Sequence, residues 1–214
     1  TIHGASMTSY EEVQRRMKLY DVGLLRIRIN EMVREDAAKK LGKPLNHNDK
    51  YYVRSVKAFA DGALGSRGAL FLEEYSDYPG YFGEPRQSED QIAESATELL
   101  KIGFNMRIHC IGDGANRVAI NAYERALKAT GIDGKKARFA LEHCQVLTPT
   151  DIPRLAELGI VASMQPLHAT EDMNFAVARM GEERLKYAYI WSDLLDLGVV
   201  VATGTDYSVS SYNP

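Results

Sequence analysis

The chain has 214 residues, 45% of them hydrophobic and 26% charged, with a formal net charge of -3 and a pI near 6.0. This composition is typical of a folded globular protein and excludes intrinsic disorder, while the slight acidity argues against a nucleic-acid or anionic-membrane partner. Because no apolar run reaches the roughly 18 residues of a membrane span and no segment resembles a signal peptide, we expect a cytoplasmic protein with a small-molecule partner.

Short apolar runs alternate with helical periodicity after residue 20, a pattern typical of βα units and a parallel sheet. The pattern predicts a first strand at 23–29 and a helix over 30–42 that ends at Gly42. The next strand is predicted at 51–60. The Gly- and Tyr-rich stretch 61–88 that follows exceeds an ordinary connection of roughly 2 to 6 residues, which indicates a functional loop.

The second half of the chain repeats the βα pattern. A helix is predicted over 88–103, with Ser88 as N-cap and Gln91 completing a capping box. The remaining predicted strands are 104–110, 137–144, 159–166 and 199–206, and the helices are 115–130, 150–158 and 182–198. Six such strands fit an open doubly wound sheet or a closed barrel. A nucleotide-binding sheet is disfavoured, because no G-x-G-x-x-G follows the first strand and GALGSRG lacks the Lys-Ser/Thr of a phosphate loop.

Four ionisable side chains lie late in, or just after, four of the predicted strands: Lys57, His109, His143 and Asp206. In a parallel barrel the carboxyl ends of the strands converge on one mouth, so these side chains would meet. Each alone has a simpler interpretation, since a single strand histidine is more often a core residue than a ligand. Asp206 alone could cap a helix, and Lys57 alone could face solvent. Their coincidence at one end of the sheet predicts a metal site.

Several motifs carry a resemblance to a known family. The blocks in question are VKAFADGALGSRGALFLEEYSD, IHCIGDGANRVAINAYE, LEHCQVLTPTDIPRLAELGIVASMQPLHATEDMN and TGTDYSVSSYNP. In this order they resemble amidohydrolase family 3 of the amidohydrolase superfamily, which includes formamide deformylase-like enzymes and proteins labelled exoenzyme regulators. The resemblance implies a (β/α)8 TIM barrel with an H-x-H pair on strand 1, a lysine on strand 4, histidines on strands 5 and 6, and an aspartate on strand 8. Lys57, His109, His143 and Asp206 match the last four metal ligands.

The resemblance also implies an activity, namely metal-dependent hydrolysis of amide or other C–N bonds that are not peptide bonds. The implied cofactor is Zn²⁺ or another divalent metal in a binuclear site, bridged by Lys57 after carboxylation by CO₂. Such metals lower the pKa of a water molecule and polarise a carbonyl group. Asp206 would be the catalytic residue that takes the proton of the water and delivers it to the leaving nitrogen.

One part of the family pattern is missing, because none of the five histidines has a partner two positions away. The opening TIHGASMTSYEEVQ resembles the end of barrel strand 2. We therefore expect residues 1–214 to form one domain, an incomplete barrel of roughly strands 2 to 8 without the family's small β-sandwich. Alone it is expected to be inactive, and its free sheet edges favour a homodimer.

Five further residues are candidates for lining the substrate pocket: Asp61, Ser66, Arg67, Gln165 and His168. The alternative for the first three is a tight turn with a surface ion pair. Asp113 either orients His109 or caps the helix that follows. Cys110 and Cys144 are expected to be buried free thiols rather than a disulfide.

Two other functions remain open at this point. The same barrel could serve as a catalytically silent regulatory or binding module, an interpretation that the missing H-x-H pair favours and the four intact ligands oppose. An isomerase that forms a Schiff base at Lys57 is disfavoured, since it leaves the two histidines and the aspartate without a role.

Overall fold

The computed structural model describes residues 1–212 and contains one curved sheet with the strand order β1-β2-β4-β5-β6-β7-β8. The strands are β1 (Ile2–Thr8), β2 (Ile29–Val33), β3 (Leu45–His47), β4 (Tyr51–Phe59), β5 (Asn105–Cys110), β6 (Ala140–His143), β7 (Val161–Met164) and β8 (Val201–Thr203). The helices are α1 (Tyr10–Asp21), α2 (Glu35–Leu41), α3 (Glu89–Lys101), α4 (Asp113–Thr130), α5 (Gly134–Ala137), α6 (Ile152–Glu157), α7 (Leu167–Asp172), α8 (Ala176–Leu185) and α9 (Trp191–Asp196).

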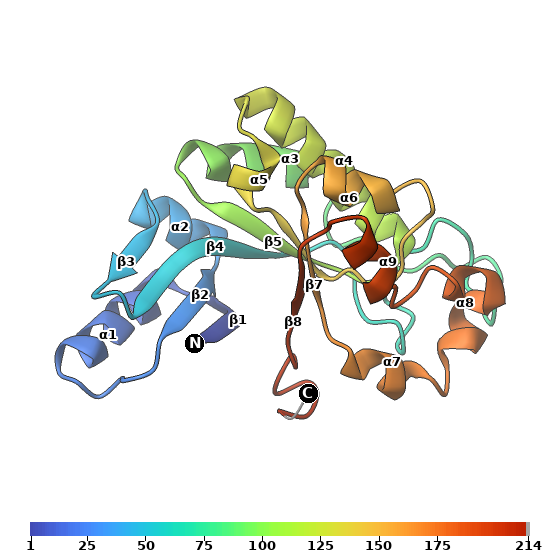
Figure 1. The fold of residues 1–214 in the computed structure, drawn as a ribbon, viewed down its shortest axis with the longest axis horizontal. Coiled ribbons are helices and arrows are strands. Elements are labelled where there is room, and N and C mark those ends of the chain that lie inside the picture. Colours follow the sequence, from blue (N-terminus) through green and yellow to red (C-terminus); the bar gives the residue numbers. More distant parts are fainter. Residues whose placement is uncertain (213–214) are drawn as a thin grey trace.

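Every neighbouring pair along this strand order is parallel, and only the short β3 pairs antiparallel, with β4. Helices α3, α4, α5 and α6 lie on the upper side of the sheet in Figure 1, and both ends of the drawn chain lie below it. The prediction of an incomplete (β/α) barrel is confirmed. In the described part of the chain, β1 and β8 are the outermost strands and each has one paired neighbour.

Strand β5 shows how the sequence builds both the core and the site. Met106, Ile108 and Cys110 are fully buried on one face, while Arg107 and His109 alternate with them on the other. Cys110 and Cys144 are buried free thiols, as predicted. The polar alternation of β5 therefore directs His109 to the face of the sheet opposite the packed core.

The first predicted βα unit is wrong in its boundaries. The strand begins at Ile29 rather than residue 23, and residues 30–33 of the predicted helix 30–42 belong to β2. Leu24 and Ile27, which suggested a buried strand, are 73% and 50% exposed. Glu31 interrupts the apolar pattern of the true strand, although its side chain is buried and bonds to Thr8 and Arg16.

The single helix predicted over 182–198 is also wrong, because the structure has two helices, α8 and α9, with a non-helical link at residues 186–190 between them. Tyr189 adopts a left-handed φ of +57°, which interrupts helical geometry. Backbone bonds join Tyr187 and Tyr189 to Leu147 and Gln145, and the isolated bridge of Val146 with Ala188 lies between them. Tertiary pairing thus overrides the helical periodicity.

The predicted capping box of Ser88 and Gln91 is present at the start of α3, and α1 begins with an equivalent box of Ser9 and Glu12. In both, the hydroxyl accepts from the backbone N–H three residues on, which stabilises the helix by about 1 kcal/mol. Within the described residues, none of the helices is both long and apolar enough to cross a membrane.

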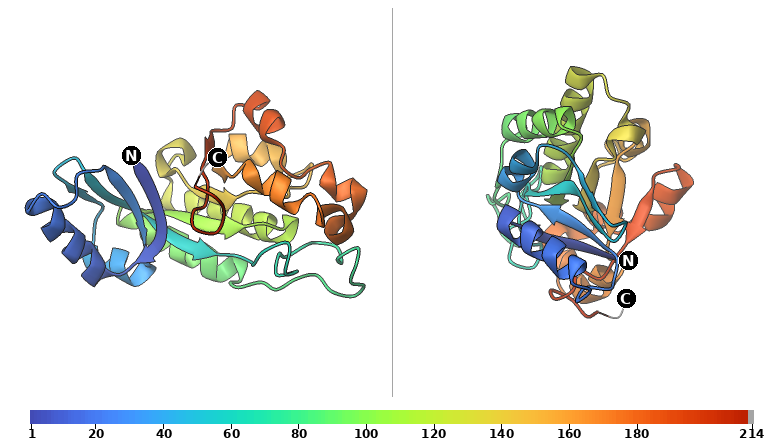
Figure 2. Two further views of the ribbon diagram at one scale, coloured as in Figure 1. Left: turned by 90° about the horizontal axis from the view of Figure 1, so that it is seen from below. Right: turned by 90° about the vertical axis from the view of Figure 1, so that its left-hand side faces the viewer.

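The long stretch 61–88 has no helix or strand but packs into a second hydrophobic cluster with α8, at the far end of the molecule from α1 (Figure 2). Phe71 and Tyr75 pack in this cluster together with Met180. Asp77 accepts from both Arg67 and Arg179. This loop and α8 are therefore packed against each other.

Candidate metal centre

A cavity of about 540 Å³ lies at the carboxyl ends of the strands. Lys57 reaches it from β4, His109 from β5, His143 from the end of β6, and Asp206 from the segment after β8. Its remaining lining residues are Ala5, Phe59, Ala63, Leu64, Gly65, Ile111, Gln145, His168, Glu171, Asp172, Val209 and Ser210. The structure thus brings together the four residues that match the family's ligands, whose roles stay predictions.

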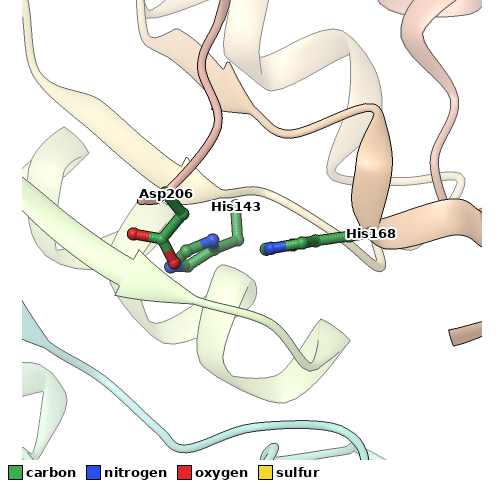
Figure 3. Close-up of side chains that lie close together, drawn as sticks. All are labelled: His143, His168 and Asp206. Carbon is green, nitrogen blue, oxygen red and sulfur yellow. The ribbon is translucent and has the colours of Figure 1, made fainter. Parts of the chain in front are cut away.

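The tightest group of potential ligands within this cavity is His143, His168 and Asp206 (Figure 3). Each offers one nitrogen or oxygen, and these atoms all lie within 4.8 Å of one another. The ring of His168, from α7, points toward the other two and stacks on His143 with centroids 5.4 Å apart. Two imidazoles and a carboxylate at this spacing are a donor set that Zn²⁺ and similar divalent metals accept.

The backbone takes unusual conformations where it presents two of these groups. His143 has φ +73° and Asp206 has φ +53°, both in the left-handed region that non-glycine residues rarely occupy. Such residues cluster at functional sites, because surrounding contacts must hold them there. At His143 the chain leaves β6, so the left-handed turn aims the imidazole at the cavity.

Hydrogen bonds fix the two strand histidines. Nε2 of His109 lies 3.2 Å from the carbonyl oxygen of Gly62, and Nδ1 of His143 lies 2.7 Å from Oε1 of Gln165. Because both partners are acceptors, the neutral rings carry their protons on these nitrogens. Nδ1 of His109 and Nε2 of His143 therefore keep their lone pairs for a metal.

Burial sets the ionisation of the site. It lowers the pKa of His109 to about 4, and it lowers the pKa of His143 well below its ordinary value, so both rings are neutral at pH 7. Burial also lowers the pKa of the Lys57 amine and raises the pKa of the Asp206 carboxyl. Neutral imidazoles are the form that binds metal, so these residues fit a metal ion.

The five candidate substrate-lining residues have different surroundings. His168 lines the cavity. Gln165 does not line it but bonds to His143, which does. Asp61 is fully buried and bonds to backbone N–H groups. The Ser66 hydroxyl donates to the Ala63 carbonyl, and Arg67 pairs with Asp77. Asp61, Ser66 and Arg67 are therefore not among the residues that line the cavity.

Sequence reasoning missed three relationships at this site. It placed His168 with the substrate, although His168 is within ligand distance of Asp206; its position just after β7, in MQPLHA, was the available signal. It did not foresee the Arg107–Glu142 ion pair, 2.9 Å between nitrogen and oxygen, on the same sheet face. It also considered Asp113 as a partner of His109, whereas Asp113 accepts from the backbone of Leu72.

Comparison with known proteins identifies the family of this chain. The model of a family described as the amidohydrolase family matches residues 2–214. The chain belongs to the amidohydrolase family. It is 37% identical to the Arabidopsis thaliana protein LONG AFTER FAR-RED 3 over 176 residues, 82% of this chain and 30% of that protein. It is 24% identical to N-substituted formamide deformylase of Arthrobacter pascens over 196 residues, 87% of this chain and 33% of the enzyme.

A solved structure supports the fold of this amidohydrolase-family chain. An uncharacterized metal-dependent hydrolase from Pyrococcus furiosus superposes with a TM-score of 0.84 at 28% identity, covering 94% of this chain and 42% of that one. The chain therefore spans less than half of that structure, and about a third of the length of the two relatives above.

Proposed function

We propose that the protein is a metal-dependent hydrolase of amide or other C–N bonds, excluding peptide bonds. The observation that carries the proposal is the grouping of His143, His168 and Asp206 within 4.8 Å, in the cavity that Lys57 and His109 also line. Membership of the amidohydrolase family and the similarity to a formamide deformylase support the C–N bond as the target.

His109 would bind a metal through Nδ1 and His143 through Nε2, since hydrogen bonds occupy their other nitrogens. Asp206 would contribute a carboxylate oxygen. A second metal would need Lys57 and ligands from a further strand, which the family places in an H-x-H pair. A bound Zn²⁺ or similar ion supplies a water of lowered pKa and polarises the scissile carbonyl.

Asp206 would move the proton. Its carboxylate oxygen would accept a proton from the attacking water and pass it to the nitrogen of the leaving amine. His168, within 4.8 Å of this carboxylate, would offer a further imidazole ligand to the metal or contact the substrate from the α7 side. The buried apolar side chains of Leu64 and Ile111 would shield one side of the reacting groups from bulk water.

Lys57 is suited to carboxylation. It is buried, its Nζ lies 5.0 Å from the centroid of the Phe59 ring, and burial lowers the pKa of the amine. The neutral amine can attack CO₂, forming a C–N bond with loss of one proton and leaving an anionic carbamate. The carbamate would then serve as a ligand.

The decisive experiment tests the full-length protein, supplied with Zn²⁺, Mn²⁺ or Fe²⁺, on a panel of N-acyl and N-formyl amines. We expect near-stoichiometric metal by elemental analysis and metal-dependent release of amine. Bound metal without hydrolysis of any panel member would reject the proposed substrate class. Absence of both metal and hydrolysis would instead support a silent regulatory or binding module.

Residues 1–214 alone should show little or no turnover, because they lack the H-x-H ligand pair. The free edges of β1 and β8 would be covered either by the rest of the protein or by a second copy of this chain. A molar-mass measurement on the isolated chain checks the homodimer. A cytoplasmic location and the lack of a nucleic-acid partner stay predictions.

A further inference from the structure

Asp61 is a fully buried carboxylate two residues beyond the end of β4. Its Oδ1 accepts from the backbone N–H of Ile111 at 3.0 Å, and its Oδ2 accepts from those of Leu70 at 2.9 Å and Gly112 at 2.8 Å. One side chain therefore ties the end of β4 to the long loop and to the β5–α4 turn. Burying a carboxylate is costly unless such bonds compensate it, and here burial raises the pKa of Asp61 to about 7.

The same carboxylate also faces a candidate metal ligand. Its Oδ1 lies 3.4 Å from Nε2 of His109, and the carbonyl oxygen of the next residue, Gly62, lies 3.2 Å from the same nitrogen. With two oxygens around it, Nε2 is the nitrogen that carries the proton of the neutral ring. This leaves Nδ1 as the atom able to bind a metal.

We propose that Asp61 is a positioning residue, which holds His109 in the Nε2–H tautomer and fixes its ring so that Nδ1 is available in the cavity. Because Oδ1 accepts from Ile111 as well, the carboxylate fixes a wall residue of the cavity and the candidate ligand together. Its part in metal binding rests on the proposed function; its control of the tautomer does not.

Asp113 provides a matched control for this role. It is also a buried carboxylate at the junction of the long loop and α4, and its Oδ1 accepts from the backbone of Leu72 at 2.9 Å, two residues from the Leu70 anchor. Within residues 1–212 the hydrogen bonds and ion pairs of His109 involve Asp61 and Gly62 rather than Asp113. Asp113→Asn therefore replaces a buried carboxylate at the same junction by an amide, without altering a group that faces His109.

The first test reads the tautomer directly, in metal-free full-length protein labelled with ¹⁵N at histidine. Wild type should show His109 protonated at Nε2. Asp61→Asn, whose amide group turns a donor toward the other donors, should move His109 toward the Nδ1–H form, and Asp113→Asn should not. A wild-type His109 protonated at Nδ1 overturns the proposal, even if Asp61→Asn does not fold.

The second test titrates the metal-free proteins with Zn²⁺. Removing a group that orients a metal-bound histidine typically costs 10- to 100-fold in affinity, so we expect that loss for Asp61→Asn and less than about threefold for Asp113→Asn. Equal losses in the two variants would mean that Asp61 serves only to anchor the loop, and the proposal fails. A protein that keeps the Nε2–H tautomer but hydrolyses nothing would reject the proposed function and leave this tautomer assignment intact.

Discussion

The imidazole rings of His109 and His143 meet edge to face, with centroids 4.6 Å apart and planes inclined at 70°. The register of β5 and β6 produces this contact, since His143 pairs with Cys110, the neighbour of His109. A proton on either ring would therefore meet both a desolvated environment and a second ring at short range. Burial therefore favours the neutral form of both rings.

This arrangement predicts how the stability of the metal-free protein depends on pH. The pKa of His109 is lowered from 6.5 to about 4, so between these pH values the unfolded state binds a proton at His109 and the folded state does not. The stability present above pH 6.5 is accordingly lost as the pH falls toward 4. The shift corresponds to about 3 kcal/mol.

The variant His109→Gln removes this linkage, and its free energy of unfolding should fall by about 3 kcal/mol less than that of wild type between pH 7 and pH 4. Asp61 acts in the opposite direction, because its raised pKa lowers stability as the pH rises. Denaturant unfolding at several pH values measures the difference. Parallel pH profiles for the two proteins would contradict the prediction.

The proposed roles of His143 and Asp206 predict different kinetic losses in the full-length protein. His143→Ala should lower metal content and hydrolysis together, because it removes an imidazole ligand. Asp206→Ala should lower the rate further than its metal content explains, by about 100- to 10,000-fold, because general acid-base catalysis is lost as well. Metal analysis and kcat on the same samples separate the two effects.

His47→Ala is the control for these variants, since His47 bonds to Asp21 near the surface and should affect neither metal content nor rate. An Asp206→Ala enzyme with a near-wild-type rate would remove Asp206 from the mechanism.

The parallel architecture could be predicted because most strands have an apolar pattern that is visible in the local sequence. In β5 the apolar Met106, Ile108 and Cys110 alternate with polar residues, and the helix after it has continuous periodicity. The same regularity places His109 and His143 at one end of the sheet. Strand ends are therefore the part of the site that sequence alone specifies well.

The features that could not be predicted depend on contacts between residues far apart in the sequence. Glu31 is buried in β2 because Thr8 and Arg16 bond to it, and a buried carboxylate hides a strand from pattern analysis. The role of Asp61 depends on backbone N–H groups 9, 50 and 51 residues away along the chain. Such long-range bonds leave no trace in local composition, so a loop aspartate was interpreted as a lining residue.

The two cysteines provide a test of the core. Cys110 and Cys144 are both fully buried, and burial raises the pKa of each thiol, that of Cys144 to about 12. Because the thiolate is the reactive form, neither should react with a thiol reagent at pH 8 in the folded protein, and both should react after unfolding. Rapid labelling of the native protein would contradict the burial of these strand ends.

The close approach of the long loop to the β5–α4 turn predicts a large effect at one glycine. Gly112 has an ordinary φ of -71°, but a Cβ there would lie 2.0 Å from the carbonyl oxygen of Leu70. Since backbone must move to admit the methyl group, Gly112→Ala should cost about 3 kcal/mol or more in the free energy of unfolding. Gly42→Ala is the contrasting control: its φ is +70° and nothing lies within 4 Å of the added Cβ, so only backbone strain of about 1–2 kcal/mol is expected.

Because the displaced loop also carries the Leu70 anchor of Asp61, Gly112→Ala should weaken Zn²⁺ binding while Gly42→Ala leaves it unchanged. Denaturant unfolding and metal titration on both variants test this, and equal stability losses would show that the loop yields at Leu70 without strain.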